Sequence, residues 1–136
     1  MILKDLSFSD FLSVLFTAQL WRLSNESKLE SLYSSSWEFD NNTWTIPTED
    51  KEDYIKVTEG LNSGKVLAVD GEDVVLDDEA VKSTSSQLWI KGPKNSDGYF
   101  WLKHKGTGKF LSLFIHKVKG ERTTLISVKG KATNVT

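Results

Sequence analysis

The sequence contains no cysteine, and this single absence removes several classes of function. Disulfide scaffolds, thiol redox chemistry, cysteine nucleophiles and cysteine-ligated zinc sites are all excluded. Long apolar runs are absent as well. No stretch approaches the roughly 18 to 20 apolar residues that cross a bilayer, so we expect no membrane span. Neither absence selects a compartment, and a cytoplasmic and a secreted location both stay open.

The residues that are present suffice for one folded domain. The chain has 136 residues, of which 38% are hydrophobic and 11% aromatic, and this composition can bury enough surface to offset chain entropy. Residues 1–18 are weakly similar to a secretion signal, but Asp5 and Asp10 lie in or beside the apolar stretch, and Phe16 stands where a small residue should precede cleavage. We expect 1–18 to be a short helical or non-native leader and 19–136 to form a single domain.

The charge is distributed unevenly along the chain. The net charge is −2, but residues 98–136 hold seven Lys, one Arg and one Glu, a balance of +7, which leaves −9 for residues 1–97. Such asymmetry is typical of a face that binds polyanions. It is equally consistent with two parts of one domain that neutralise each other.

Beyond residue 20 the pattern predicts strands. Apolar residues alternate with polar ones over four to seven positions, and β-branched and aromatic residues are plentiful in these runs. Turn signals such as Asn62-Ser63-Gly64 separate the runs, and many short strands at regular spacing indicate an all-β domain. The predicted strands cover residues 53–58, 65–69, 73–76, 87–91, 99–104, 109–115 and 122–128.

Two long segments of the chain repeat one another. Trp44 and Trp89 are 45 residues apart, and each is followed ten residues later by a tyrosine, Tyr54 or Tyr99, that opens an alternating run. The runs "GKVLAV" and "GKFLSL" then follow at matching places. A shorter unit begins at Trp21, only 23 residues before Trp44, and a last strand is expected near position 134. The repeat predicts three related units.

The three tryptophans suggest a physical reason for the repeat. One four-stranded unit cannot bury its apolar face alone, whereas three units around a common axis remove the open sheet edges. A tryptophan is a large apolar plate with one N–H donor, which suits the centre of such an arrangement. We therefore expect Trp21, Trp44 and Trp89 to converge on a shared axis.

The tripeptides that contain these tryptophans resemble a known family. Residues 19–21 and 87–89 both read Gln-Leu-Trp, which matches the Gln-x-Trp motif of the ricin-B-type β-trefoil lectins, whereas residues 42–44 keep only the tryptophan. The resemblance covers about residues 19–131 and implies an all-β β-trefoil with pseudo-threefold repeats, one of them shortened. It also implies a non-enzymatic module without a cofactor that binds a glycan or glycoprotein.

The sugar site of these lectins has a known position in the repeat. An aspartate in the segment Leu-Asp-Val accepts hydrogen bonds from two sugar hydroxyls while an aromatic ring stacks on the sugar. The matching positions here are Ala68 and Ser112, a departure that puts the usual site in doubt in both clear units. Asp70 and Asp73 are the candidates to substitute for it in the second unit, and solvated turn residues are the alternative interpretation.

The short unit contains the most sugar-like local cluster. Trp37, Asp40 and Asn42 bring together an aromatic plate, a carboxylate and an amide, which is the set that a pyranose needs. A partly buried strand aromatic beside a turn is the alternative interpretation of the same residues.

Catalysis and metal binding are not expected. The two histidines, His104 and His116, lie among lysines without a nucleophile elbow or paired carboxylates, so we expect both on the surface. The acidic run at residues 77–80 lacks the alternating oxygens and central glycine of a calcium loop.

Two alternatives to sugar binding stay open. Because Ala68 and Ser112 replace the aspartate, the domain is alternatively a structural trefoil or one that binds another protein. The basic C-terminal unit favours a sulfated glycan or a phosphoinositide, whereas nucleic acid is not expected because aromatic residues do not interleave with the basic ones. The polyanion-binding candidates are Lys103, Lys105, Lys109, Lys117, Lys119 and Arg122.

Overall fold

The computed structural model describes residues 19–32, 39, 41–80, 84–118 and 121–129, with side chains described as far as Leu113. The leader, Trp37, Asp40 and the strand expected near position 134 lie outside the described residues. What the sequence predicts for those segments therefore stays a prediction.

The described part of the chain consists of strands and contains no helix, as the alternating pattern predicts. The predicted strand at residues 53–58 is divided into two short strands, whereas the C-terminal pair is longer than expected. The strands are β1 Trp21–Leu23, β2 Leu29–Ser31, β3 Trp44–Thr45, β4 Glu52–Asp53, β5 Lys56–Val57, β6 Lys65–Asp70, β7 Asp73–Asp78, β8 Trp89–Lys91, β9 Leu102–His104, β10 Phe110–Val118 and β11 Glu121–Lys129.

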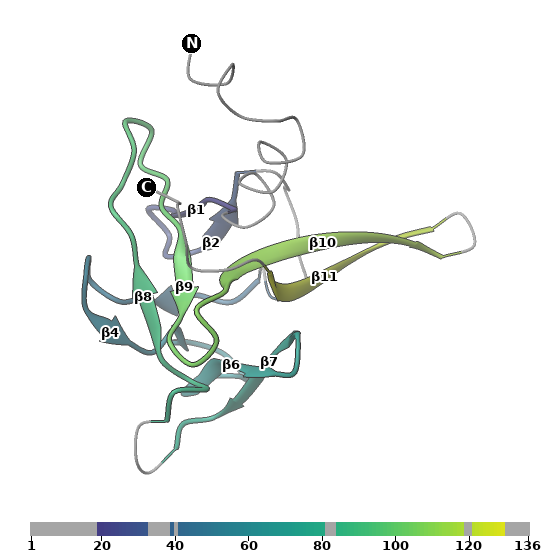
Figure 1. Ribbon diagram of the computed structural model, residues 1–136, viewed down its shortest axis with the longest axis horizontal. Helices are drawn as coiled ribbons and strands as arrows, with labels where there is room; N and C mark the ends of the chain where they lie inside the picture. Colours follow the sequence, from purple (N-terminus) through teal and green to yellow (C-terminus); the bar gives the residue numbers. More distant parts are fainter. Residues whose placement is uncertain (1–18, 33–38, 40, 81–83, 119–120, 130–136) are drawn as a thin grey trace.

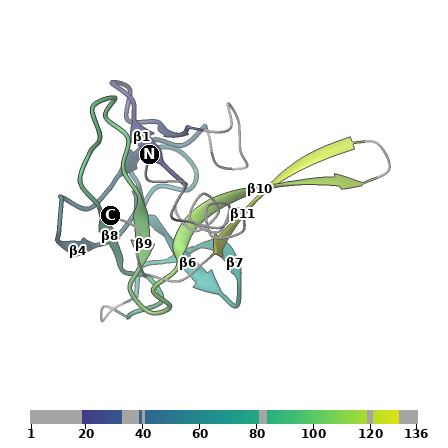
Figure 2. The same ribbon diagram turned by 45° about the horizontal axis from the view of Figure 1, so that its top comes forward.

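Nine of these strands form one antiparallel sheet in the order β3-β5-β6-β7-β11-β10-β9-β8-β4, and β1 pairs with β2 in a second sheet. Figure 1 shows most strands gathered into a body from which the β10–β11 hairpin projects, and Figure 2 shows the same projection from a second direction. The hairpin contacts the sheet at its base, through Phe110 opposite Lys103 and Ser127 opposite Asp73.

The first described strand joins the last unit of the chain. The backbone N–H of Trp21 donates to the carbonyl of Phe100, and the N–H of Phe100 donates back to Trp21, each over 2.8 Å. Trp21 also lies opposite Ser31 on its other side. The two exchanged bonds connect segments about 80 residues apart, and they close an edge that β1 would otherwise expose.

The other two tryptophan strands also contact a neighbouring segment on each side. On one side, each tryptophan lies opposite a residue of a later strand in the chain. On its other side, it contacts an earlier segment. Trp44 lies opposite Val57 and donates its N–H to Ser27, and Trp89 lies between His104 and Asp53.

The three tryptophans occupy one hydrophobic core, as the sequence predicts. Trp21, Trp44 and Trp89 are all fully buried and belong to a single cluster. The indole Nε1–H of Trp21 donates to the carbonyl of Leu111, and that of Trp89 donates to the carbonyl of Leu67, both over 3.0 Å. The two acceptors hold the same place in "GKFLSL" and "GKVLAV", so the same position of the repeat accepts the indole hydrogen bond in both units.

The glutamines of the two tripeptides satisfy backbone groups, but at different places. The Gln19 amide donates to the carbonyl of Leu113 over 2.8 Å and accepts from its N–H over 2.7 Å, as a neighbouring strand would. The Gln87 amide donates to the carbonyl of Asp78 and accepts from the N–H of Ala80. Gln19 therefore holds β10 where the hairpin leaves the body, and Gln87 anchors the end of β7.

His104 is buried, so the expectation of a surface histidine at this position is wrong. The N–H of Thr107 donates to Nδ1 over 3.1 Å, which leaves the ring proton on Nε2, and Nε2 donates to the carbonyl of Ser86 over 2.9 Å. The ring meets Trp89 edge-on at a centroid distance of 4.9 Å. Phe100, Leu102 and His104 alternate along the chain and all point inward, and this spacing was the signal for burial. His116 lies on β10 beyond the described side chains.

Burial lowers the pKa of His104, because the charged imidazolium loses water in the core, and the hydrogen bond to Ser86 only partly opposes this. As the pH falls, the unfolded chain therefore takes up a proton at His104 at a higher pH than the folded chain does. The resulting stabilisation is complete above the unfolded pKa, about 6.5, and is lost as the pH falls through that value towards the folded pKa.

Replacing Trp89 by Phe should destabilise the protein by about 2 to 3 kcal/mol, because the change leaves the Leu67 carbonyl without its indole donor and opens a small cavity. Urea unfolding followed by circular dichroism measures the loss. Leu61, which is fully exposed, provides the control, and Leu61→Ala should change stability by less than about 0.5 kcal/mol. Equal midpoints for the two variants would contradict the central role of the indole.

The free energy of unfolding should decrease as the pH falls from 7 to 5.5, with a slope from His104 of at most about 1.4 kcal/mol per pH unit. Urea unfolding at a series of pH values measures this decrease. The variant His104→Val, which carries the residue found opposite Trp44, should have a flatter profile. His116→Asn is the control and should keep the wild-type slope. A flatter pH profile in that variant would show that His116, and not His104, causes the pH dependence of stability.

Candidate functional site

The positions at which the resembled lectins carry their sugar-binding aspartate are buried here, on the strand faces opposite the core residues Leu67 and Leu111. Ala68 lies in β6 and Ser112 in β10, and both are buried. The hydroxyl of Ser112 donates to the carbonyl of Phe110 over 3.2 Å, so its polar atom is used within the strand. Neither side chain is a carboxylate, and both are largely removed from solvent.

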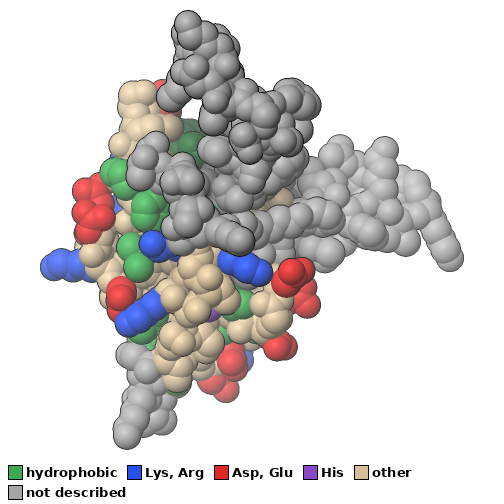
Figure 3. Space-filling view, viewed as in Figure 1, with side chains coloured by type: hydrophobic (Ala, Val, Ile, Leu, Met, Phe, Trp, Pro, Cys, Tyr) green, Lys and Arg blue, Asp and Glu red, His purple; other side chains and the backbone are tan. Residues whose placement is uncertain are grey.

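Asp70 and Asp73 lie at the tip of the β6–β7 hairpin and are exposed. They are direct partners across the two strands, separated only by Gly71 and Glu72. Gly71 has a positive φ of 68°, a conformation that favours glycine at the start of a tight hairpin turn. The structure therefore brings the two candidate carboxylates together, and Figure 3 shows acidic side chains gathered over this part of the molecule.

Asn42 is the one member of the short-unit cluster that the structure describes. It is half-buried and lies in the turn before β3, where its backbone N–H donates to the carbonyl of Phe39 over 3.2 Å. Its proposed companions, Trp37 and Asp40, lie outside the described residues. The geometry of this cluster thus stays a prediction.

The basic candidates of the C-terminal unit differ in their surroundings. Lys105 forms an exposed ion pair with Glu52 over 2.6 Å, which partly neutralises it. Lys103 is half-buried, with its ammonium 5.7 Å from the centre of the Trp101 ring. Lys109 follows the turn before β10 and is half-buried. The side chains of the remaining candidates, Lys117, Lys119 and Arg122, lie outside the description.

Trp101 is an aromatic side chain that the sequence reasoning did not select. It points to the opposite face from Phe100 and Leu102, is half-buried, and meets Phe110 edge-on at a centroid distance of 5.6 Å. Its indole lies against Gly92, where an added Cβ would come within 2.2 Å of the ring. The alternation in "YFWLKH" was the signal, since Trp101 falls on the outward positions of that run.

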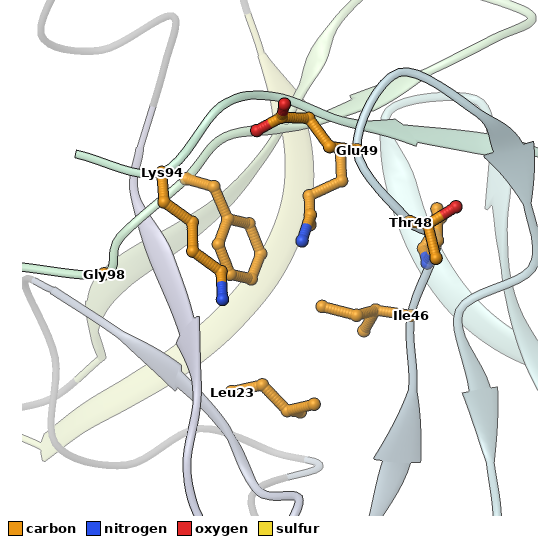
Figure 4. A pocket seen from close by; sticks show the side chains of 9 residues that line it. Leu23, Ile46, Thr48, Glu49, Lys94 and Gly98 are labelled. Atoms are coloured by element: carbon orange, nitrogen blue, oxygen red, sulfur yellow. The ribbon is translucent and has the colours of Figure 1, made fainter.

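A cleft of about 350 Å³ opens where the tryptophan strands end. Leu23 is the last residue of β1, Ile46 follows β3, and Lys91 is the last residue of β8, so each lies two positions after its tryptophan. Figure 4 shows Leu23 and Ile46 pointing toward one another across this cleft. The sequence reasoning missed it because its walls come from three separate segments.

The described residues contain no group of three or more His, Asp or Glu side chains placed to hold a metal ion. Within the same part of the chain, no helix has the length and apolar character needed to cross a membrane.

Comparison with known proteins places the chain in a family. The family model of the ricin-type beta-trefoil lectin domain-like proteins matches residues 40–126, which is more than half of the chain. No curated protein and no solved structure matches it. The match extends over two of the three buried tryptophans and both "GK" runs. The chain belongs to the family of ricin-type β-trefoil lectin domain-like proteins.

Proposed function

We propose that the protein is a non-enzymatic carbohydrate-binding module, and that residues 19–136 form one trefoil of three related units. Membership of a lectin-like family is the observation that carries this proposal. The paired tryptophan strands support the threefold relation, because each of Trp21, Trp44 and Trp89 is buried and contacts two neighbouring segments. A module of this kind binds its ligand on the outside of the units, where the sequence is free to vary.

The sugar would be held by side chains at two places. One is the short-unit cluster of Trp37, Asp40 and Asn42, and the other is the tip of the β6–β7 hairpin. Support for the second place is that Asp70 and Asp73 are exposed cross-strand partners, and neither forms an ion pair with any lysine or arginine whose side chain is described. Two adjacent free carboxylates can accept hydrogen bonds from neighbouring sugar hydroxyls.

A glycan array, followed by NMR titration with the simple sugars of any hit, tests this proposal. We expect saturable shifts of amide resonances near residues 37–42 or 70–73, because the ligand displaces water from those groups. Trp37→Ala should abolish binding at the first place, and Asp70→Asn combined with Asp73→Asn should weaken it about tenfold at the second.

Asp97→Asn is the matched control, since Asp97 is an exposed acidic residue in the loop between β8 and β9. It should bind like the wild type. An array without hits, together with a Trp37→Ala variant that is indistinguishable from wild type, would count decisively against a sugar-binding module.

The burial of Ala68 and Ser112 favours a second candidate, a structural or protein-binding trefoil without a sugar site. This candidate predicts that no simple sugar shifts any resonance at millimolar concentration. A single saturating titration with a sugar would remove it.

Binding of a sulfated glycan or phosphoinositide through the basic C-terminal unit is the third possibility, supported by the +7 balance of residues 98–136. Heparin-column retention at low salt should decrease steeply as salt is added, because counterions compete for the lysines. The double variant Lys103→Gln and Lys109→Gln should elute earlier than the wild type. Retention that is absent, or indifferent to salt, would exclude this mode.

A further inference from the structure

The cleft at the ends of the tryptophan strands departs from the three-unit pattern in one respect. The residues two positions after the tryptophans are Leu23, Ile46 and Lys91, so two units contribute an aliphatic side chain and the third contributes a lysine. An aliphatic residue at the third place would continue the hydrophobic core outwards. The lysine instead adds a positive charge to a cleft whose other two equivalent positions are aliphatic.

The walls of the cleft are divided between apolar and polar groups. Leu23 and Ile46 are half-buried and pack against the core, and Phe100 lies beneath them fully buried. Exposed polar side chains, including Thr48 and Lys94, form the rim. A volume of about 350 Å³ is at the lower end of the range typical of small-molecule sites.

Among the described residues, the two lysines of the cleft form no ion pair. The half-buried Lys91 places its ammonium 5.0 Å from the centre of the Phe100 ring, and neither Lys91 nor Lys94 forms an ion pair with any described carboxylate. Glu49 lines the same cleft, but Figure 4 shows its carboxylate directed away from Leu23 and Ile46, while Lys94 extends into the cleft.

Three lysines elsewhere in the described structure form ion pairs, whereas Lys28, Lys51, Lys103 and Lys109 form none with a described carboxylate. Lys65 pairs with Asp78 over 3.1 Å, and Lys105 pairs with Glu52 over 2.6 Å. Removing part of the water from an ammonium without supplying a counter-charge is unfavourable. Two lysines beside an aliphatic wall therefore form a place where an anion with an apolar body would gain from both contacts.

We propose that this cleft binds a small amphiphilic anion, with its carboxylate or phosphate head on Lys91 and Lys94 and its short apolar tail against Leu23 and Ile46. The hydroxyl of Thr48 is available to the head as a further donor. The lining of the cleft shares no residue with either of the two places proposed for sugar. The two proposals therefore stand or fall independently.

NMR titration of the full chain with hexanoate and with hexyl phosphate tests this proposal, and the two probes distinguish a carboxylate head from a phosphate head. At least one probe should shift amide resonances of Leu23, Ile46, Lys91 and Gly98 saturably at millimolar concentration. Hexanol, which lacks the charge, and acetate, which lacks the tail, should bind at least tenfold more weakly. Glucose at the same concentration should leave these resonances in place.

Lys91→Met, which keeps an apolar stem of similar shape, should weaken binding of the anion at least tenfold while leaving hexanol unchanged. Lys94→Gln provides a second variant at the exposed rim, where folding is not at risk, and should weaken binding in the same direction. Lys65→Met, on β6, is the control and should bind like the wild type. The proposal is overturned if neither anion saturates, if hexanol binds as well as hexanoate, or if both cleft variants bind like the wild type.

Discussion

The structure depends on indole side chains that are buried at the centre and hydrogen-bonded to backbone carbonyls of other segments. Trp21 donates to Leu111 and Trp89 donates to Leu67, so each ring fills the core and also holds a neighbouring strand in place. Burying a tryptophan removes roughly 150 to 250 Å² from water, which contributes about 4 to 6 kcal/mol before the entropy cost. A buried N–H without an acceptor would offset much of this gain, and the repeated run supplies the acceptor in both cases.

This constraint positions the surface features that bear on function. The tryptophan strands are short and are held at the core, so the residues that follow them meet at one end and form the cleft. The turns that leave the core, such as the one between Asp70 and Asp73, present exposed side chains to solvent. The buried pattern therefore identifies the family, whereas the ligand depends on residues that the pattern does not constrain.

The departures from the lectin pattern are consistent with this division. Ala68 and Ser112 stand at buried strand positions, where a small uncharged side chain leaves no unpaired charge. His104 is tolerated in the core because both of its ring nitrogens have partners and because it stays neutral near pH 7.

The sequence alone determined the all-β class, the family and the burial of Trp21, Trp44 and Trp89, because periodicity and repeated tripeptides are local properties of the chain. It could not determine the register between the units. Aligning Tyr54 with Tyr99 would place Leu102 opposite Trp89, as Val57 lies opposite Trp44, yet His104 occupies that place. A shift of two residues keeps the same side chains inward, so the alternating pattern does not distinguish the two registers.

Only the tertiary structure decided which distant residues became neighbours. The candidate carboxylates at the β6–β7 tip were predictable, since Asp70 and Asp73 are close in sequence and flank a glycine turn. The cleft was not, because Leu23, Ile46 and Lys91 are separated by 23 and 45 residues and meet only when the three strands converge. Local pattern specifies which face of a strand is apolar, but the proximity of separate strands arises from packing them around the tryptophan core.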